Sequence, residues 1–327
     1  MKNSQAVIFS LAGPALNEKE RDFFRASSPL GFILFARNCV NPQQVRKLTD
    51  DLRDCVGWHC PILIDQEGGR VQRLKPPYWR QHEPMRVFGE RAENGDFEGA
   101  VESLGFSTLQ IAEELVAAGV DVNCAPVLDV LAPQTDEVIG DRAFSADPQL
   151  VAQLGLSVCR HYLAAGITPV IKHIPGHGRA AADSHKELPV VDAPLSAMMH
   201  TDFEPFRVVA GSEVGRAVWG MTAHVVYTAV DPDHPITVSK PGIEGIIRRS
   251  IGFDGFLLSD DLDMEALAGY GRVPERCGAV LESGCDAALY CAGKLEIMEK
   301  IAESVPKLSQ KALERLQKAV EFRKVAA

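Results

Sequence analysis

The sequence predicts a (β/α)₈ barrel, the TIM-barrel fold, in which parallel strands alternate with helices. Eight short apolar runs occur along the 327 residues, amphipathic stretches separate them, and no linker rich in Pro, Gly or Ser divides the chain. Repeated strand–helix alternation is typical of a parallel sheet, and eight such units in a chain of this length favour a closed barrel. We therefore expect a single domain over residues 1–327.

The apolar runs are expected to be the barrel strands. Each is apolar nearly throughout, which is typical of a strand that is buried on both faces. A doubly wound open sheet is the alternative, but no G-x-G-x-x-G segment opens a helix after a strand, which counts against a dinucleotide-binding site. The runs cover residues 6–13, 31–36, 61–69, 120–130, 167–176, 217–227, 255–261 and 286–291.

The stretches between the runs carry helix signals. Asn41 is a capping residue, Pro42 stands at the first helical position, and Val45, Leu48 and Leu52 then fall on one face. The segment from Ile301 to the end is expected to be a charged surface helix. Two further amphipathic stretches contain Leu104, Leu109, Ile111 and Leu115, and Leu195, Met199, Phe203 and Phe206.

Composition restricts the partners and the compartment that we expect. The chain is 46% hydrophobic, as is usual for a globular protein. Its net charge of −10 would repel the phosphate backbone of a nucleic acid. The apolar segment Ala6–Ala12 is short for a signal peptide, and no run is long enough to span a membrane. The 8 cysteines form no C-x-x-C pair and are expected to be buried, reduced thiols. We therefore expect a cytoplasmic protein without a nucleic-acid or membrane partner.

Polar residues gather where the predicted strands end. In a barrel, chemistry is carried by the carboxyl ends of the strands and by the loops that follow them. Acids, bases and cations at this position after five runs indicate a site there. These residues are Asp65 to Arg70 and Arg73 after the third run, Asp141 and Arg142 after the fourth, Lys172 and His173 in the fifth, His224 in the sixth, and Asp260 and Asp261 in the seventh.

The loop over residues 172–191 contains a candidate general acid/base. Asp183 and His185 are two positions apart. A carboxylate that accepts a hydrogen bond from one imidazole nitrogen fixes the tautomer and raises the basicity of the other nitrogen. Gly176 and Gly178 would allow this loop to fold over a pocket.

Two other interpretations of this loop remain open. Its histidines and its aspartate could bind a metal ion, or the loop could be solvated and idle. The sequence shows no H-x-H or H-E-x-x-H spacing, which weakens the metal interpretation, and we expect no metal ligands.

The segment over residues 252–267 contains a candidate nucleophile. An apolar strand leads directly into Asp260, so this carboxylate would be held rigidly, as an attacking group must be. The alternative is a structural role, because Asp261 or Asp263 could cap a following helix. Asp260 lies nearest the strand and is the better candidate for chemistry.

At these segments the sequence resembles the glycoside hydrolase family 3 β-N-acetylglucosaminidases, and most of all their compact bacterial members of peptidoglycan recycling. The resemblance extends from about Gly31 to Cys291 and rests on five motifs in order. The motifs are DQEGGRVQRL, GDRAFSADP, KHIPGHG with the following DSH, MTAHVVY and GFDGFLLSDDLDM.

The resemblance implies roles for particular residues. Asp260 would be the nucleophile, His185 the acid/base and Asp183 its partner, without a cofactor. Carboxylates and cations, which make strong hydrogen bonds to sugar hydroxyls, would hold the N-acetylglucosamine unit. These are Asp65, Arg73, Arg142, Lys172 and His173.

The implied reaction is the release, with retention of configuration, of terminal N-acetylglucosamine (GlcNAc) from muropeptides that contain 1,6-anhydro-N-acetylmuramic acid. Three alternatives remain. Phosphate could replace water as the acceptor, since a neutral histidine does not repel an anion as a carboxylate does. The protein could be a metal-dependent hydrolase that uses the His-rich loop, or an inactive barrel that only binds sugar.

Overall fold

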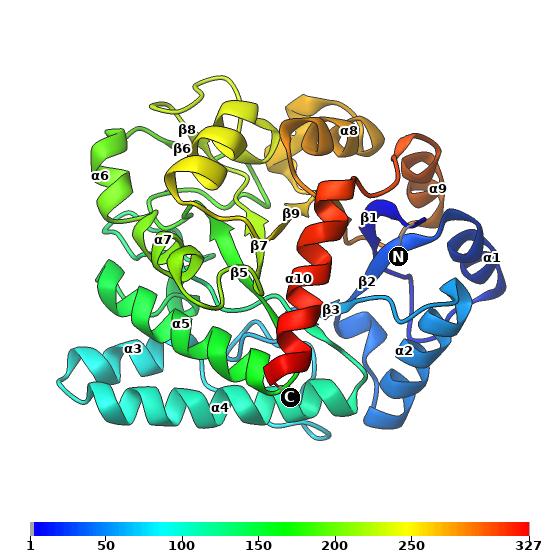
Figure 1. Cartoon of the computed structure of the whole chain (residues 1–327), viewed down its shortest axis with the longest axis horizontal. Helices are drawn as coiled ribbons and strands as arrows, with labels where there is room; N and C mark the ends of the chain where they lie inside the picture. Colours follow the sequence, from blue (N-terminus) through cyan, green and yellow to red (C-terminus); the bar gives the residue numbers. More distant parts are fainter. Residues whose placement is uncertain (1–2, 327) are drawn as a thin grey trace.

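The computed structural model describes residues 3–326 and contains a closed barrel of parallel strands (Figure 1). Its order around the ring, β1-β10-β9-β7-β5-β4-β3-β2, confirms the predicted (β/α)₈ architecture. The strands are β1 (Gln5–Phe9), β2 (Pro29–Leu34), β3 (Ile62–Ile64), β4 (Val122–Asn123), β5 (Thr168–Ile174), β7 (Trp219–Thr222), β9 (Phe256–Asp261) and β10 (Ala287–Tyr290).

Every predicted apolar run overlaps one barrel strand, but the fourth run is mostly not a strand. Of residues 120–130, only Val122 and Asn123 belong to β4. Pro126 follows and has no N–H to donate to a neighbouring strand. The chain beyond it stays beside β5, because Leu128 N donates to Lys172 O at 2.6 Å. Outside the barrel, β6 (Val190–Val191) pairs with β8 (Val226–Tyr227).

Helices surround the barrel. The Asn41 side chain accepts a hydrogen bond from Gln44 N at the start of α2, and Val45, Leu48 and Leu52 are buried, as predicted. The α-helices are α1 (Glu18–Ser27), α2 (Pro42–Val56), α3 (Met85–Glu93), α4 (Phe97–Ala117), α5 (Pro148–Ala164), α6 (Leu195–His200), α7 (Glu204–Gly211), α8 (Val273–Ser283), α9 (Leu295–Ser304) and α10 (Gln310–Ala326). The π-helix η4 covers Pro241–Ser250, and the short 3₁₀ segments are η1 (Ala36–Asn38), η2 (Gly140–Arg142), η3 (Ile236–Val238) and η5 (Glu265–Tyr270).

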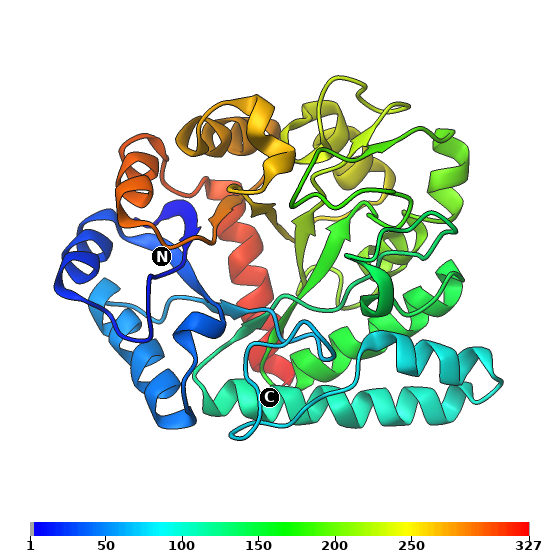
Figure 2. The same ribbon diagram turned by 180° about the vertical axis from the view of Figure 1, so that it is seen from behind.

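Two details of the helix prediction are wrong. Leu109 does not share the buried face of α4, because 43% of it is exposed while Leu104 and Ile111 are buried. The last segment is not a surface helix but two helices, α9 and α10. Leu313 and Leu316 of α10 pack against apolar side chains that fill the barrel. This helix therefore covers the end of the barrel at which the strands begin. Figure 1 shows α10 in front of the strands, and in Figure 2 it lies behind them.

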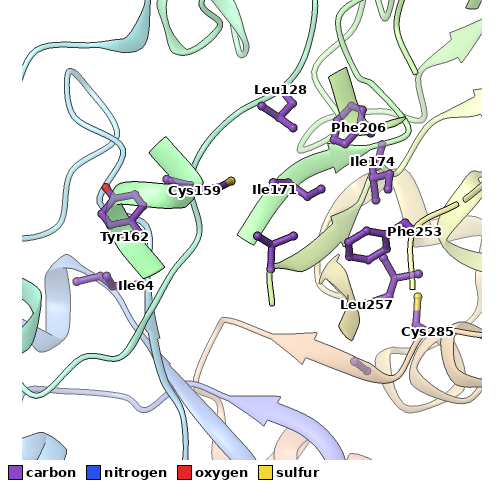
Figure 3. Close-up of a cluster of buried hydrophobic side chains, with 14 of the residues drawn as sticks. Ile64, Leu128, Cys159, Tyr162, Ile171, Ile174, Phe206, Phe253, Leu257 and Cys285 are labelled. Carbon is purple, nitrogen blue, oxygen red and sulfur yellow. The ribbon is translucent and has the colours of Figure 1, made fainter. Parts of the chain in front are cut away.

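The main core lies between the barrel and its helices. Figure 3 shows part of it, where Ile171 and Ile174 of β5 lie near Phe206 of α7 and Phe253. All 8 cysteines are free thiols, and each except the half-buried Cys39 is buried, as expected. None of the helices that the structure describes has both the length and the apolar composition needed to cross a membrane.

Candidate active site

A cavity of about 200 Å³ opens at the carboxyl ends of the barrel strands. Loops after β3, β4, β5 and β9 surround it, on the side of the barrel that faces the viewer in Figure 2. Seven of the eight predicted site residues line the wall of this cavity. The eighth, Asp183, contacts the cavity-lining His185. The seven are Asp65, Arg73, Arg142, Lys172, His173, His185 and Asp260.

A network of buried charges forms one end of the cavity. Lys172 Nζ lies 2.8 Å from Asp65 Oδ1 and 2.6 Å from Glu67 Oε1. Arg142 binds both carboxylate oxygens of Glu67, with distances of 2.8 Å and 2.9 Å. Arg73 reaches the other oxygen of Asp65 at 3.1 Å. The charges alternate in sign, which fixes the geometry of side chains that would otherwise be flexible.

Electrostatics keeps these groups ionised. Burial alone would raise the pKa of Asp65, but Lys172 and Arg73 hold that pKa well below its usual range. Burial likewise opposes ionisation of Glu67, yet Arg142 and Lys172 lower its pKa to about 2. Burial would lower the pKa of Lys172, and the two carboxylates raise it above its ordinary value instead. The end of the cavity therefore offers fixed charges to a polar ligand.

The turn after β3 is shaped by amides. Asn123 of β4 accepts a hydrogen bond from Gln66 N and donates one to Gln66 O. The Gln66 side chain in turn accepts from the backbone N–H groups of Arg73 and Leu74. Gly68 has a φ of +97°, a conformation that favours glycine. Because Gln66 is held in this way, its neighbours Asp65 and Glu67 both line the cavity.

A second Asp–His pair lies beside β5. The imidazole Nδ1 of His173 is 2.7 Å from Asp129 Oδ2, and the other oxygen of Asp129 accepts from His177 N at 2.6 Å. Burial alone would raise the pKa of Asp129, but His173 lowers it to about 2. His177 is also buried, which lowers its pKa to about 4, and its Nε2 lies 3.3 Å from Ser184 Oγ.

Asp260 stands at the end of β9 and lines the cavity. Its Oδ1 accepts a hydrogen bond from Asp261 N at 2.8 Å. Burial alone would raise the pKa of Asp260, but His224 and His173 hold it below the ordinary value. The carboxylate is thus ionised, which is the form in which a carboxylate can act as a nucleophile.

The neighbouring Asp261 has the opposite electrostatic character. Burial raises its pKa to about 6. Its Oδ1 accepts from Cys291 N at 3.0 Å and from Asp263 N at 3.2 Å. Its backbone oxygen lies 3.0 Å from His224 Nε2. The structure does not place Asp261 as the cap of a regular α-helix, because a turn and then η5 follow it.

The Asp183–His185 pair lies at the mouth of the cavity. His185 Nδ1 is 2.8 Å from Asp183 Oδ1, and the same oxygen accepts from His185 N at 2.9 Å. Burial alone would raise the pKa of Asp183, but its hydrogen bonds with His185 hold it below the ordinary value. The His185 side chain is 63% exposed, so its Nε2 is open to a ligand or to water.

Contacts on both sides hold the loop that carries this pair. Ser184 is buried, and its carbonyl accepts from Ala266 N at 3.2 Å. Earlier in the loop, Thr135 Oγ1 donates to Gly178 O at 2.5 Å, and Arg179 forms an ion pair with Asp202 at 2.6 Å. Although the loop has little regular secondary structure, these contacts define where His185 stands.

Sequence reasoning proposed no catalytic or sugar-binding role for Glu67, Asp129, His177 or Asp261. Glu67, His177 and Asp261 line the cavity, and Asp129 contacts His173 in its wall. Glu67 could have been found, because it is two residues from Asp65 in the same motif. Asp129 also left a signal, since it is a single carboxylate within an apolar run. Its partner His173 is 44 positions away, and no local pattern relates the two.

Within residues 3–326, no group of three or more His, Cys, Asp and Glu side chains is placed to hold a metal ion. Asp260 and His185 do line one cavity, which the proposed chemistry requires.

Comparison with known proteins agrees with these features. Residues 7–323 match the glycosyl hydrolase family 3 N terminal domain. The chain belongs to this family. It is therefore a glycoside hydrolase, and the match extends from β1 to α10.

Several relatives cover most of the chain. A β-hexosaminidase of Chromobacterium violaceum is 39% identical over 314 residues, which are 95% of this chain and 85% of that protein. NagZ from Neisseria gonorrhoeae in complex with N-trifluoroacetyl-D-glucosamine superposes with a TM-score of 0.88 at 31% identity, covering 99% of this chain and 93% of that one. Another structure of the same protein is a complex with a zinc ion.

A longer relative shares the same barrel. The family 3 β-N-acetylglucosaminidase from Paenibacillus sp. str. FPU-7 superposes with a TM-score of 0.88 at 30% identity, over 98% of this chain. This chain spans only 62% of that protein's length.

Proposed function

We propose that this glycoside hydrolase is a retaining exo-β-N-acetylglucosaminidase, with Asp260 as nucleophile and His185 as acid/base. The observation that carries the proposal is that an ionised, half-buried Asp260 and an exposed His185 line the same cavity. Its action on N-acetylhexosamines agrees with the names of the β-hexosaminidase relatives.

The first step forms a glycosyl-enzyme. Asp260 attacks the anomeric carbon, and the bond from that carbon to the leaving oxygen breaks. His185 donates its proton to the leaving oxygen. In most retaining enzymes a second carboxylic acid has this role; here the imidazole would perform it, with Asp183 holding Nδ1 so that Nε2 faces the reaction.

In the second step the sugar is transferred to water. His185 removes a proton from the water, the oxygen of the water bonds to the anomeric carbon, and Asp260 leaves as a carboxylate. Two displacements at the same carbon retain the configuration. General acid–base assistance of this kind is worth about 10²–10⁴-fold in rate.

The shape of the cavity supports exo action on one sugar unit. Buried charges of Asp65, Glu67 and Lys172 form its end, which leaves no path for further sugars in that direction. We propose that Asp65, Arg73, Arg142, Lys172 and His173 bind the GlcNAc unit.

Covalent labelling tests the nucleophile. A 2-fluoro glycoside slows hydrolysis of the glycosyl-enzyme, so peptide mass spectrometry should find one adduct, on Asp260. Asp260→Ala should not be labelled and should lose activity on an aryl GlcNAc glycoside. An adduct on any other residue would refute the assignment.

The acid/base role of His185 predicts a dependence on the leaving group. His185→Ala should lose about 10²–10⁴-fold in kcat/KM on glycosides with poor leaving groups, which need the proton most, and much less on an activated aryl glycoside. Glu187→Ala is a matched control on the same exposed turn. An equal loss with every leaving group would count against His185 as the acid.

We further propose that the natural substrate is a GlcNAc-containing muropeptide with 1,6-anhydro-N-acetylmuramic acid. The support is the similarity to NagZ and the five motifs. An aryl glycoside panel should show preference for β-GlcNAc over β-GalNAc, β-glucose and β-xylose. The natural substrate itself is tested by turnover of the purified disaccharide.

Two alternatives are resolved by the same assay. Formation of GlcNAc 1-phosphate when phosphate is added would show a phosphorylase. Loss of activity with a chelator and recovery with zinc would show a metal-dependent hydrolase, which the zinc complex of the gonococcal NagZ makes worth testing. We also keep as proposals a single domain over residues 1–327 and a cytoplasmic location.

A further inference from the structure

The buried carboxylate of Asp129 is the strongest feature that the reaction above does not use. No part of Asp129 is exposed, and it does not line the cavity. All of its hydrogen bonds go to the segment that carries the proposed sugar-binding residues. Oδ2 is 2.7 Å from His173 Nδ1, while Oδ1 accepts from His173 N at 3.2 Å and from His177 N at 2.6 Å.

We propose that Asp129 is a positioning residue that acts through His173 and the turn after it. An ionised carboxylate has no proton to donate, so the proton of this hydrogen bond is on His173 Nδ1. The other ring nitrogen, Nε2, is then the one that His173 presents to the cavity, near Asp260. This inference rests on the proposed function, in which His173 binds the GlcNAc unit of the substrate.

The backbone bonds give Asp129 a second effect on the same site. Its Oδ1 holds the N–H groups of His173 and His177, four residues apart, and so closes the turn between them. Lys172 precedes this turn, and the His185 loop follows it. One carboxylate thus orients a proposed sugar-binding imidazole and fixes the start of the loop that bears the proposed acid/base.

Asp129→Asn separates the two effects. The asparagine side chain has the same shape, and its oxygen can still accept from both backbone N–H groups. Its NH₂ group, however, would face His173 Nδ1, which must then be an acceptor and give up its proton to Nε2. The turn should persist while the tautomer of His173 is reversed.

The tautomer is measured by long-range ¹H–¹⁵N correlation spectra of histidine-labelled protein, with His173→Gln used for assignment. We expect a proton on Nδ1 of His173 in the wild type and on Nε2 in Asp129→Asn. A bare Nδ1 in the wild type would overturn the proposal. This readout needs no substrate, so it stands even if the proposed reaction is wrong, and it needs no variant of Asp129 to fold.

Kinetics tests whether the orientation matters for turnover. Removing the partner that orients a liganding histidine typically costs about 10–100-fold, and we expect such a loss in kcat/KM of Asp129→Asn on an aryl GlcNAc glycoside. His173→Ala should show a similar loss, and the double variant should be no worse than His173→Ala alone, because both changes remove one interaction. Additive losses would overturn the proposal.

A structural role alone would give a different pattern. Asp286 is another buried aspartate; it bridges Arg248 and Arg315 at 3.0 Å and 2.8 Å and does not line the cavity. Asp286→Asn should lower thermal stability and leave the His173 tautomer, kcat and KM unchanged. Unchanged kinetics in Asp129→Asn, with only a lower melting temperature, would reduce Asp129 to such a structural group.

Discussion

At the scale of single residues, neighbouring cations determine whether a carboxylate of this site is ionised. Glu67 and Asp65 are buried, yet both stay ionised because Lys172, Arg142 and Arg73 surround them. Asp261 also lines the cavity but forms no ion pair with any residue that the structure describes, and burial raises its pKa to about 6. Carboxylates in the wall of one cavity therefore lose their protons at different pH values, and Asp261 is protonated only below about pH 6.

The raised pKa of Asp261 predicts a pH-dependent stability difference. In the folded protein this group binds its proton up to about pH 6, against about pH 4 when unfolded. Its stabilising contribution is therefore present below pH 4 and is lost as the pH rises through 6. The free energy of unfolding of Asp261→Asn, relative to that of the wild type, should therefore increase by about 2–3 kcal/mol as the pH rises from 4 to 7.

Chemical denaturation at several pH values measures this difference. Asp263→Asn is the matched control, because Asp263 is exposed on the same turn. A difference between Asp261→Asn and the wild type that stays constant over this range would contradict the prediction.

Among the structural elements, the loop after β5 carries the proposed acid/base pair, Asp183 and His185. It contains little regular structure, yet Gly178 packs so closely that an added Cβ would lie 1.8 Å from Val130 O. The segment after β4 thus supports the loop that carries Asp183 and His185. A loop can position a catalytic group when backbone contacts define its path.

Gly178→Ala should displace this loop. Because the clash is with backbone, it cannot be relieved by rotating a side chain, and an error of about 1 Å in the position of His185 can cost about 10²-fold in rate. We expect kcat/KM on poor leaving groups to fall by at least about tenfold. Gly278→Ala in α8, where a Cβ meets nothing within 4 Å, is the control. Equal activity of the two variants would show that the loop adapts.

In the molecule as a whole, the two ends of the barrel have separate tasks. The carboxyl ends of the strands carry the cavity, and α10 closes the other end with Leu313, Leu316 and neighbouring side chains. Arg315 of this helix is buried and forms ion pairs with the buried Asp286 and the partly exposed Asp254, which connects α10 to the barrel. Stability and chemistry are thus located at opposite ends of one fold.

This separation predicts a variant that loses stability without losing activity. Leu316→Ala leaves a cavity under α10 and should cost about 2–5 kcal/mol in the free energy of unfolding, with kcat and KM unchanged at a temperature where the protein is folded. Gln317→Ala, on the exposed side of the same helix, should change stability by less than about 0.5 kcal/mol. A changed KM in Leu316→Ala would contradict the separation.

The order of strands and helices, and the polar residues at the strand ends, could be read from the sequence. Apolar runs, capping residues such as Asn41 and strand-end carboxylates such as Asp260 are local patterns, and the parallel barrel brings strand ends together in every such chain. The pairing of Glu67 with Arg142, the hold of Asp129 on His173 and the burial of α10 needed the folded chain. Each joins residues far apart in sequence, and no local periodicity records which distant partner will neutralise a buried charge or cover an apolar surface.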